Sequence, residues 1–125
     1  MNLLFEQETQ NIIKACYEVH NVLGRGFTEP IYQVALETEL QLQGIPYERE
    51  SYIPFYYKGV EHNNLLRPDF VCYGHIIVEL KAVSELLPEH EAQLINYLKA
   101  ADVPVGLLIN FGQEKVQIKR RVHLY

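Results

Sequence analysis

The stretch from Asp69 to Lys81 constrains the fold more than any other part of the chain. Two short runs, 69–72 and 76–81, flank the residues Tyr73, Gly74 and His75, and this spacing is typical of a β-hairpin. In antiparallel pairing around that loop, residues 69, 79 and 81 share one face of the hairpin. The other face carries apolar residues alone: Phe70, Cys72, Ile76, Val78 and Leu80. A shift of one residue would destroy both faces, so the pattern predicts this register.

In this register Asp69 lies directly opposite Glu79, and Lys81 follows on the same face. Directly opposed residues have Cβ atoms about 5 Å apart, so the two carboxylates repel unless a proton or a cation lies between them. A hard divalent ion such as Mg²⁺ prefers oxygen ligands of this kind, and a neighbouring lysine can orient or deprotonate the attacking water. The trio therefore suits metal-assisted hydrolysis of a phosphodiester. The alternative is a salt-bridged trio on a solvated sheet face.

The rest of the pattern predicts a mixed sheet packed by helices, in one domain of residues 1–125. Apolar residues at steps of three and four predict a first helix that ends at Gly24 and Gly26 and a second that runs from a Thr28 cap and Glu29 to Gly44. Helical spacing returns from about residue 88 to 101 and predicts a third helix. Strands are expected over 47–57, 65–73, 76–83, 105–111 and 115–122, with a turn at Lys58-Gly59. The predicted class is α/β (α+β), in the order α-α-β-β-β-α-β-β.

Composition and charge exclude several classes of protein. The 125 residues, 48% of them hydrophobic, are enough to bury a continuous core. No apolar run approaches the roughly 18 residues of a membrane span, and no basic-then-apolar leader is present, so we expect a cytoplasmic protein without a membrane segment. Cys16 and Cys72 have neither disulfide nor metal-site spacing. The net charge of -5 weakens an interaction with nucleic acid without excluding it.

Several motifs, taken in order, resemble one superfamily of nucleases. Pro68-Asp69, followed after nine residues by Glu79-Leu80-Lys81, resembles the PD-(D/E)XK nuclease signature. Upstream, the run 26–32 (Gly-Phe-Thr-Glu-Pro-Ile-Tyr) matches the motif that names the GxxExxY protein family. Downstream, the run 106–112 (Gly-Leu-Leu-Ile-Asn-Phe-Gly) resembles the characteristic strand of that family. The resemblance implies a core of a helix, three antiparallel strands, a second helix and a further strand.

The resemblance also implies roles for individual residues. Asp69, Glu79 and Glu29 would bind Mg²⁺ or Mn²⁺ together with the Leu80 carbonyl, and Lys81 would serve the nucleophile. Glu29 has an alternative role, because an acid in the first turn of a helix is a common partner of the helix dipole.

Three further residues are candidates around this site. Gln93 and Tyr97 are four apart and resemble the Gln-x-x-x-Tyr motif of RecB-type members, in which it helps to place the substrate. Taken alone, that spacing is equally typical of ordinary helix packing. His20 is a candidate accessory ligand, although we expect it to be packed and hydrogen-bonded.

The sequence thus predicts a Mg²⁺-dependent nuclease that hydrolyses DNA or RNA, with Asp69, Glu79 and Lys81 as catalytic residues. The alternative is a catalytically silent nuclease-fold subunit with a binding or regulatory role, which the acidic charge favours. The chain has little room for a separate recognition domain, so a homodimer, a partner protein or shape alone would supply specificity. Three tyrosines could stack bases, although aromatic strands more often form packing surfaces; they are Tyr52, Tyr56 and Tyr57.

Overall fold

The computed structural model describes residues 4–124, which form three helices and seven strands in two sheets. The helices are α1 (Glu6–Leu23), α2 (Glu29–Leu42) and α3 (Pro88–Ala101). The strands are β1 (Tyr47–Arg49), β2 (Ile53–Tyr57), β3 (Val60–Leu66), β4 (Phe70–Cys72), β5 (Ile76–Lys81), β6 (Val105–Asn110) and β7 (Gln117–Val122). Among these elements, no helix has the length and apolar character that a membrane crossing needs.

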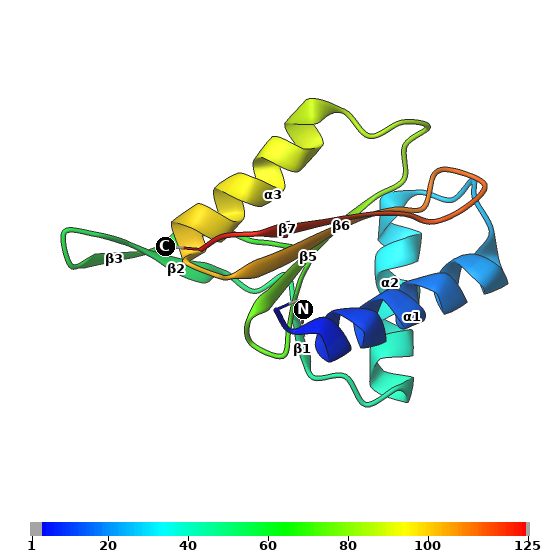
Figure 1. Ribbon diagram of the computed structural model, residues 1–125, viewed down its shortest axis with the longest axis horizontal. Coiled ribbons are helices and arrows are strands. Elements are labelled where there is room, and N and C mark those ends of the chain that lie inside the picture. Colours follow the sequence, from blue (N-terminus) through cyan, green and yellow to red (C-terminus); the bar gives the residue numbers. More distant parts are fainter. Residues whose placement is uncertain (1–3, 125) are drawn as a thin grey trace.

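Five strands form the main sheet in the order β1-β4-β5-β6-β7. Only the central β5–β6 pair of this sheet is parallel, and α3 supplies the crossover between them that parallel strands require. Figure 1 shows α3 on one side of the sheet and α1 and α2 on the other. Because helices cover both faces, β6 is buried along its whole length, as its apolar sequence predicted. The mixed sheet flanked by helices is therefore confirmed.

Each face of the sheet has its own apolar cluster. The cluster under α1 and α2 contains the apolar face of the predicted hairpin, every residue of which is at most 1% exposed: Phe70, Cys72, Ile76, Val78 and Leu80. On the opposite face, Ile77 and Leu108 pack against Leu94 and Leu98 of α3. The alternation of the hairpin sequence thus selects which cluster each side chain joins.

Two predicted strands are each broken in two, which corrects the expected order to α-α-β-β-β-β-β-α-β-β. The segment 47–57 is interrupted at Glu50, whose φ of 53° lies in the left-handed region. The segment 65–73 is interrupted near Pro68, which has no N–H to donate to a sheet. The extra strands β2 and β3 form a separate hairpin, turned at Lys58 and Gly59 as predicted, that projects from the main sheet beside α3 (Figure 1).

The start of α2 agrees with the sequence in position but not in detail. Thr28 is the N-cap residue, as predicted, but its side chain makes no capping hydrogen bond. Its carbonyl instead accepts the N–H of Ile31 at 3.1 Å. Glu29 therefore opens the helix with Pro30 beside it, a position in which Pro loses no hydrogen bond.

The chain just after β5 is fixed by the fully buried Asn110 at the end of β6. Asn110 Oδ1 accepts hydrogen bonds from the N–H groups of Val83 and Gly112, each at 3.0 Å, and its Nδ2 donates to the Val83 carbonyl at 2.9 Å. Gly112 is required here because any Cβ would collide with the backbone of Val83. This arrangement holds the segment that immediately follows Lys81.

Candidate functional site

Asp69 and Glu79 lie opposite each other where β4 approaches β5. The ladder between these strands has the predicted register, which places the two residues face to face. Asp69 Oδ2 accepts a hydrogen bond from the backbone N–H of Leu80 at 2.7 Å, which fixes the carboxylate. The structure therefore brings together the pair on which the sequence analysis depends.

Glu79 is a buried acid with an unused oxygen. Its side chain is 8% exposed, and its Oε1 has no hydrogen-bond partner among the described residues. Burial, together with the neighbouring Asp69 carboxylate, raises the pKa of Glu79 to about 9, and the nearby Lys81 partly opposes this rise. Without a cation, Glu79 is therefore protonated near neutral pH.

A pocket of about 370 Å³ opens beside this pair. Glu29, at the start of α2, lines it together with Asp69 and Leu80, so three of the four predicted metal ligands border one cavity. Glu79 does not line this pocket but lies opposite Asp69 across the two strands. Lys81 follows Glu79 on the same strand and is close enough to influence its charge.

Two residues of this pocket were missed by the sequence analysis, Gln33 and Glu50. Gln33 Nε2 donates to Glu50 Oε1 at 3.2 Å and to Asp69 Oδ1 at 3.4 Å. Arg49 donates to Gln33 Oε1 at 3.0 Å and so orients the amide toward the acids. Gln33 could have been found, since it lies one helical turn after Glu29 on the same face. Glu50 gave no local signal, because its position depends on the break between β1 and β2.

Tyr97, with Gln93 one helical turn before it, lies close to Asp69 and Glu79. Burial raises the pKa of Tyr97, and the charge of Glu79 raises it further. Gln93 donates a side-chain hydrogen bond to Tyr97 that has the opposite effect on this pKa. The helical Gln-x-x-x-Tyr pair therefore lies next to the acid pair rather than on an unrelated part of α3.

His20 is packed and hydrogen-bonded, as expected. Its Nε2 lies 2.9 Å from the Gln113 carbonyl, and its ring is parallel to that of Phe111 at 6.3 Å. Phe111 in turn stacks on Tyr32 with ring centroids 4.6 Å apart. These contacts place His20 in the cluster between the sheet and α1 and α2, and they account for its burial without a metal.

The acid pair fits a divalent cation of the Mg²⁺ type. Such an ion is bound through one or two carboxylates, with water and phosphate oxygens as its other ligands. The unpartnered Glu79 Oε1 and the repulsion from Asp69 are the features that a cation would relieve. Within residues 4–124, however, no three His, Cys, Asp or Glu side chains gather closely enough to form a complete metal site. Glu29 therefore borders the pocket without completing a cluster of three.

Comparison with known proteins places this arrangement in a family. The sequence model of the PD-(D/E)XK nuclease superfamily matches residues 6–121. The chain belongs to this superfamily. In this PD-(D/E)XK protein, β4 and β5 bring to one face the three residues that the sequence predicts to form the signature, Asp69, Glu79 and Lys81. The narrower resemblance to the GxxExxY protein family stays a prediction.

A solved structure has the same fold as this PD-(D/E)XK protein. The crystal structure of SSO0001 superposes with a TM-score of 0.56 at 20% identity, covering 97% of this chain. The chain spans 61% of the length of that protein, and the likeness concerns the fold alone. No curated protein matches the sequence.

Proposed function

We propose that this chain is a metal-dependent nuclease that hydrolyses phosphodiester bonds of DNA or RNA in the cytoplasm. The observation that carries this proposal is the buried pair of Asp69 and Glu79, in which Glu79 Oε1 has no partner among the described residues. A structural ion pair would leave no such oxygen, whereas an acid site awaiting a cation does. Membership of the PD-(D/E)XK superfamily supports the same proposal.

Each residue has a chemical role in this proposal. Asp69 and Glu79 would hold Mg²⁺ or Mn²⁺, and Leu80 and Glu29 border the neighbouring pocket and would add the remaining protein ligands. When bound, the ion acts as a Lewis acid toward the water and the phosphate. The Nζ atom of Lys81, on the face of Glu79, would orient the attacking water as an ammonium donor, and as the neutral amine it would take up the proton that this water releases.

Gln93 and Tyr97 position the substrate in this proposal. The Tyr97 hydroxyl lies beside the acids and accepts a hydrogen bond from Gln93. It is available to a phosphate oxygen of the strand to be cleaved, because a tyrosine with a raised pKa remains a hydrogen-bond donor at neutral pH.

The test is hydrolysis of labelled single-stranded and double-stranded DNA and RNA in Mg²⁺ or Mn²⁺. We expect cleavage by the unaltered protein, loss with EDTA, and a decrease of about 100-fold or more in Lys81→Ala. Lys115→Ala, on an exposed loop after β6, is the matched control and should cleave normally. A product whose rate is the same in Lys81→Ala would come from a contaminant and would refute the proposal.

A second candidate is a nuclease-fold subunit that binds without hydrolysis. It is favoured by the lack of a three-residue ligand cluster among residues 4–124 and by the net charge of -5. Under this alternative a second copy or a partner protein would supply what the chain lacks. Binding of Mn²⁺ that depends on Asp69, without cleavage of any of the four substrates, would favour it over the enzyme.

A further inference from the structure

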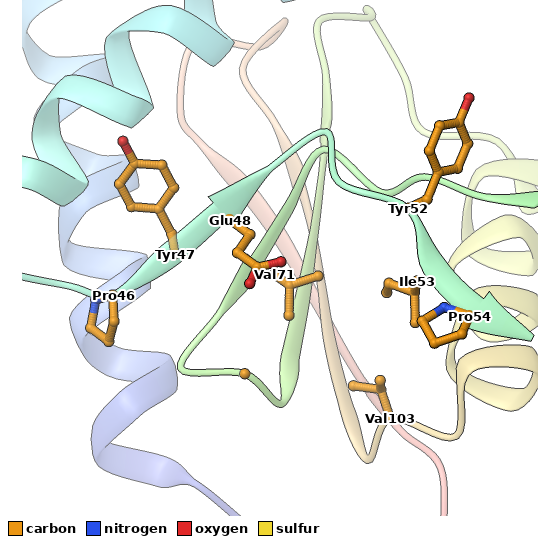
Figure 2. Close-up of a pocket in the computed structure, with 9 residues that line it drawn as sticks. Pro46, Tyr47, Glu48, Tyr52, Ile53, Pro54, Val71 and Val103 are labelled. Carbon is orange, nitrogen blue, oxygen red and sulfur yellow. The ribbon is translucent and has the colours of Figure 1, made fainter. Parts of the chain in front are cut away.

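A second pocket, of about 350 Å³, opens on the sheet face that carries the acid pair. Its walls are mostly apolar and include Ile53, Pro54, Val71 and Val103. Figure 2 shows Glu48 beside Val71 on one side of the pocket and Ile53 with Pro54 on the other. A concave apolar site with one charged group suits a small flat ligand that has a polar edge.

Glu48 gives this pocket its polar selectivity. Its exposed carboxylate makes no hydrogen bond or ion pair with another side chain among residues 4–124. An ionised carboxylate only accepts hydrogen bonds, so it selects a ligand edge that donates N–H groups. It disfavours a carbonyl oxygen at the same place.

The pocket is the immediate neighbour of the acid pair. Val71 and Asp69 are two residues apart in the β4 segment, so their side chains point to the same face about 7 Å apart. Glu48 pairs with Val71, and the N–H of Glu50 donates to the Asp69 carbonyl at 3.0 Å. A single polymer strand can therefore occupy both sites at once.

Tyr52 and Arg67 connect the two sites. Tyr52 lines the pocket and is 50% exposed, and the Arg67 guanidinium lies 5.6 Å from the centre of its ring. Arg67 Nε donates to the Glu50 carbonyl at 3.0 Å, and half of the Arg67 side chain faces solvent. An exposed tyrosine ring can stack on a base, and an exposed guanidinium can bind the adjoining phosphate.

The exposure of neighbouring tyrosines supports the same use of this surface. Tyr56 and Tyr57 of β2 are each 59% exposed. Of the two uses that the sequence left open, this exposure favours stacking on bases over packing, and Tyr52 is the one of the three tyrosines that lines the pocket.

We propose that this pocket binds one unpaired nucleobase of the substrate and selects bases that carry an exocyclic amino group. The inference rests on the proposed nuclease function and names its substrate class, single-stranded nucleic acid or a strand with a flipped base. Glu48 accepts a hydrogen bond from the amino group of cytosine, adenine or guanine. Thymine and uracil offer only N3–H on this edge, and the carbonyl oxygens on both sides of it repel the carboxylate, so these bases bind less tightly. In a duplex the amino edge is paired, so the base must be unpaired to enter.

The test measures binding separately from hydrolysis. The full chain with Glu79→Gln is titrated with fluorescent single strands of dC, dA or dT of equal length, and anisotropy reports affinity. We expect dC and dA to bind about tenfold more tightly than dT. Glu48→Gln should remove this preference. Glu18→Gln, the same charge change at an exposed site on α1, should keep it.

Two further variants test the pocket walls. Tyr52→Ala should weaken binding of all three strands about tenfold, whereas Tyr52→Phe should retain it. Val71→Phe fills the pocket from the wall beside Glu48 and should remove the base preference while the Glu48 carboxylate stays in the chain. Circular dichroism shows whether each variant has folded. If one variant has not folded, the folded variants test the base pocket.

Equal affinities for dC and dT, a preference that survives Glu48→Gln, or no binding of any strand would overturn the base pocket. Selective binding without metal-dependent cleavage by the unaltered protein would leave the pocket in place and refute the proposed nuclease. Cleavage that depends on Lys81, with no base preference, would support the proposed nuclease and overturn the base pocket. Binding of an unrelated peptide with equal affinity would identify the pocket as a protein-docking site and refute the inference.

Discussion

The carboxyl group of Glu79 faces the carboxylate of Asp69 across β4 and β5, and burial together with that charge raises the Glu79 pKa from 4.5 to about 9. The folded protein therefore retains a proton that the unfolded chain has released. The stabilising contribution of that proton is fully present below about pH 4.5 and is lost as the pH rises through about 9. The pair thus links the candidate site to the stability of the whole fold.

The first prediction concerns Glu79→Gln in the absence of metal. Because glutamine cannot ionise, the free energy of unfolding should no longer fall between about pH 5 and pH 9. At about pH 8 the variant should be more stable than the unaltered protein by about 2 kcal/mol, because glutamine is neutral at every pH, whereas Glu79 must take up a proton on folding. Urea denaturation in EDTA across this pH range measures the effect. Glu114→Gln, at an exposed position, should retain the original slope.

The second prediction concerns a divalent ion. At about pH 8, Mg²⁺ or Mn²⁺ should raise the free energy of unfolding, by about 2.7 kcal/mol at a concentration 100 times the Kd. Asp69→Asn should abolish this stabilisation because it removes one of the two opposed charges, and EDTA should reverse it in the unaltered protein. Thermal unfolding with and without the ion is the measurement. Equal stabilisation of Asp69→Asn would show that the ion binds elsewhere.

The third prediction concerns the contact between Arg49 and Gln33. Arg49 orients the Gln33 amide, which donates to Asp69 and Glu50. A double-mutant cycle with Arg49→Met and Gln33→Leu should give a coupling energy of about 1–2 kcal/mol, as expected for a hydrogen bond with a charged donor. Arg49 also pairs with Glu37, and the cycle removes that separate contribution. A coupling energy near zero would show that the two side chains act independently.

The fourth prediction concerns glycines of β6 and the loop that follows it. Gly112→Ala should cost about 2 kcal/mol or more, because the new Cβ would collide with the Val83 backbone. Gly106→Ala meets the side chains of Leu94 and Leu98 rather than backbone and should cost less. Chemical denaturation of both variants gives the comparison. A larger loss in Gly106→Ala would contradict the role assigned to the contact with Val83.

The register of the site could be predicted because only one alignment of the hairpin separates acids from apolar residues. Burial of Phe70 and Val78 on one face then forces Asp69 and Glu79 to the other. The boundaries of α3 followed equally well from helical spacing and Pro88, since local pattern and tertiary packing agree there.

The breaks in the strands could not be predicted in the same way. Glu50 has a left-handed backbone that most side chains avoid, and it is held by a hydrogen bond to the distant Asp69. The segment 47–57 carries a strand-like pattern on both sides of this break, so its sequence resembles one continuous strand. Gln33 was missed for another reason, because a polar residue within a helix has no distinctive pattern until its partners are known.

The β2–β3 hairpin begins after Glu50 and ends before Asp69, and those two residues are joined by a backbone hydrogen bond at its base. A loop closed at its base in this way can change in length or composition at its tip without displacing the acids. The protruding arm is thus a place where insertion or exchange of residues could diversify the choice of target among related proteins while their chemistry stays constant. Exchanging the β2–β3 hairpin between such proteins would transfer the choice of target and leave the activity unchanged.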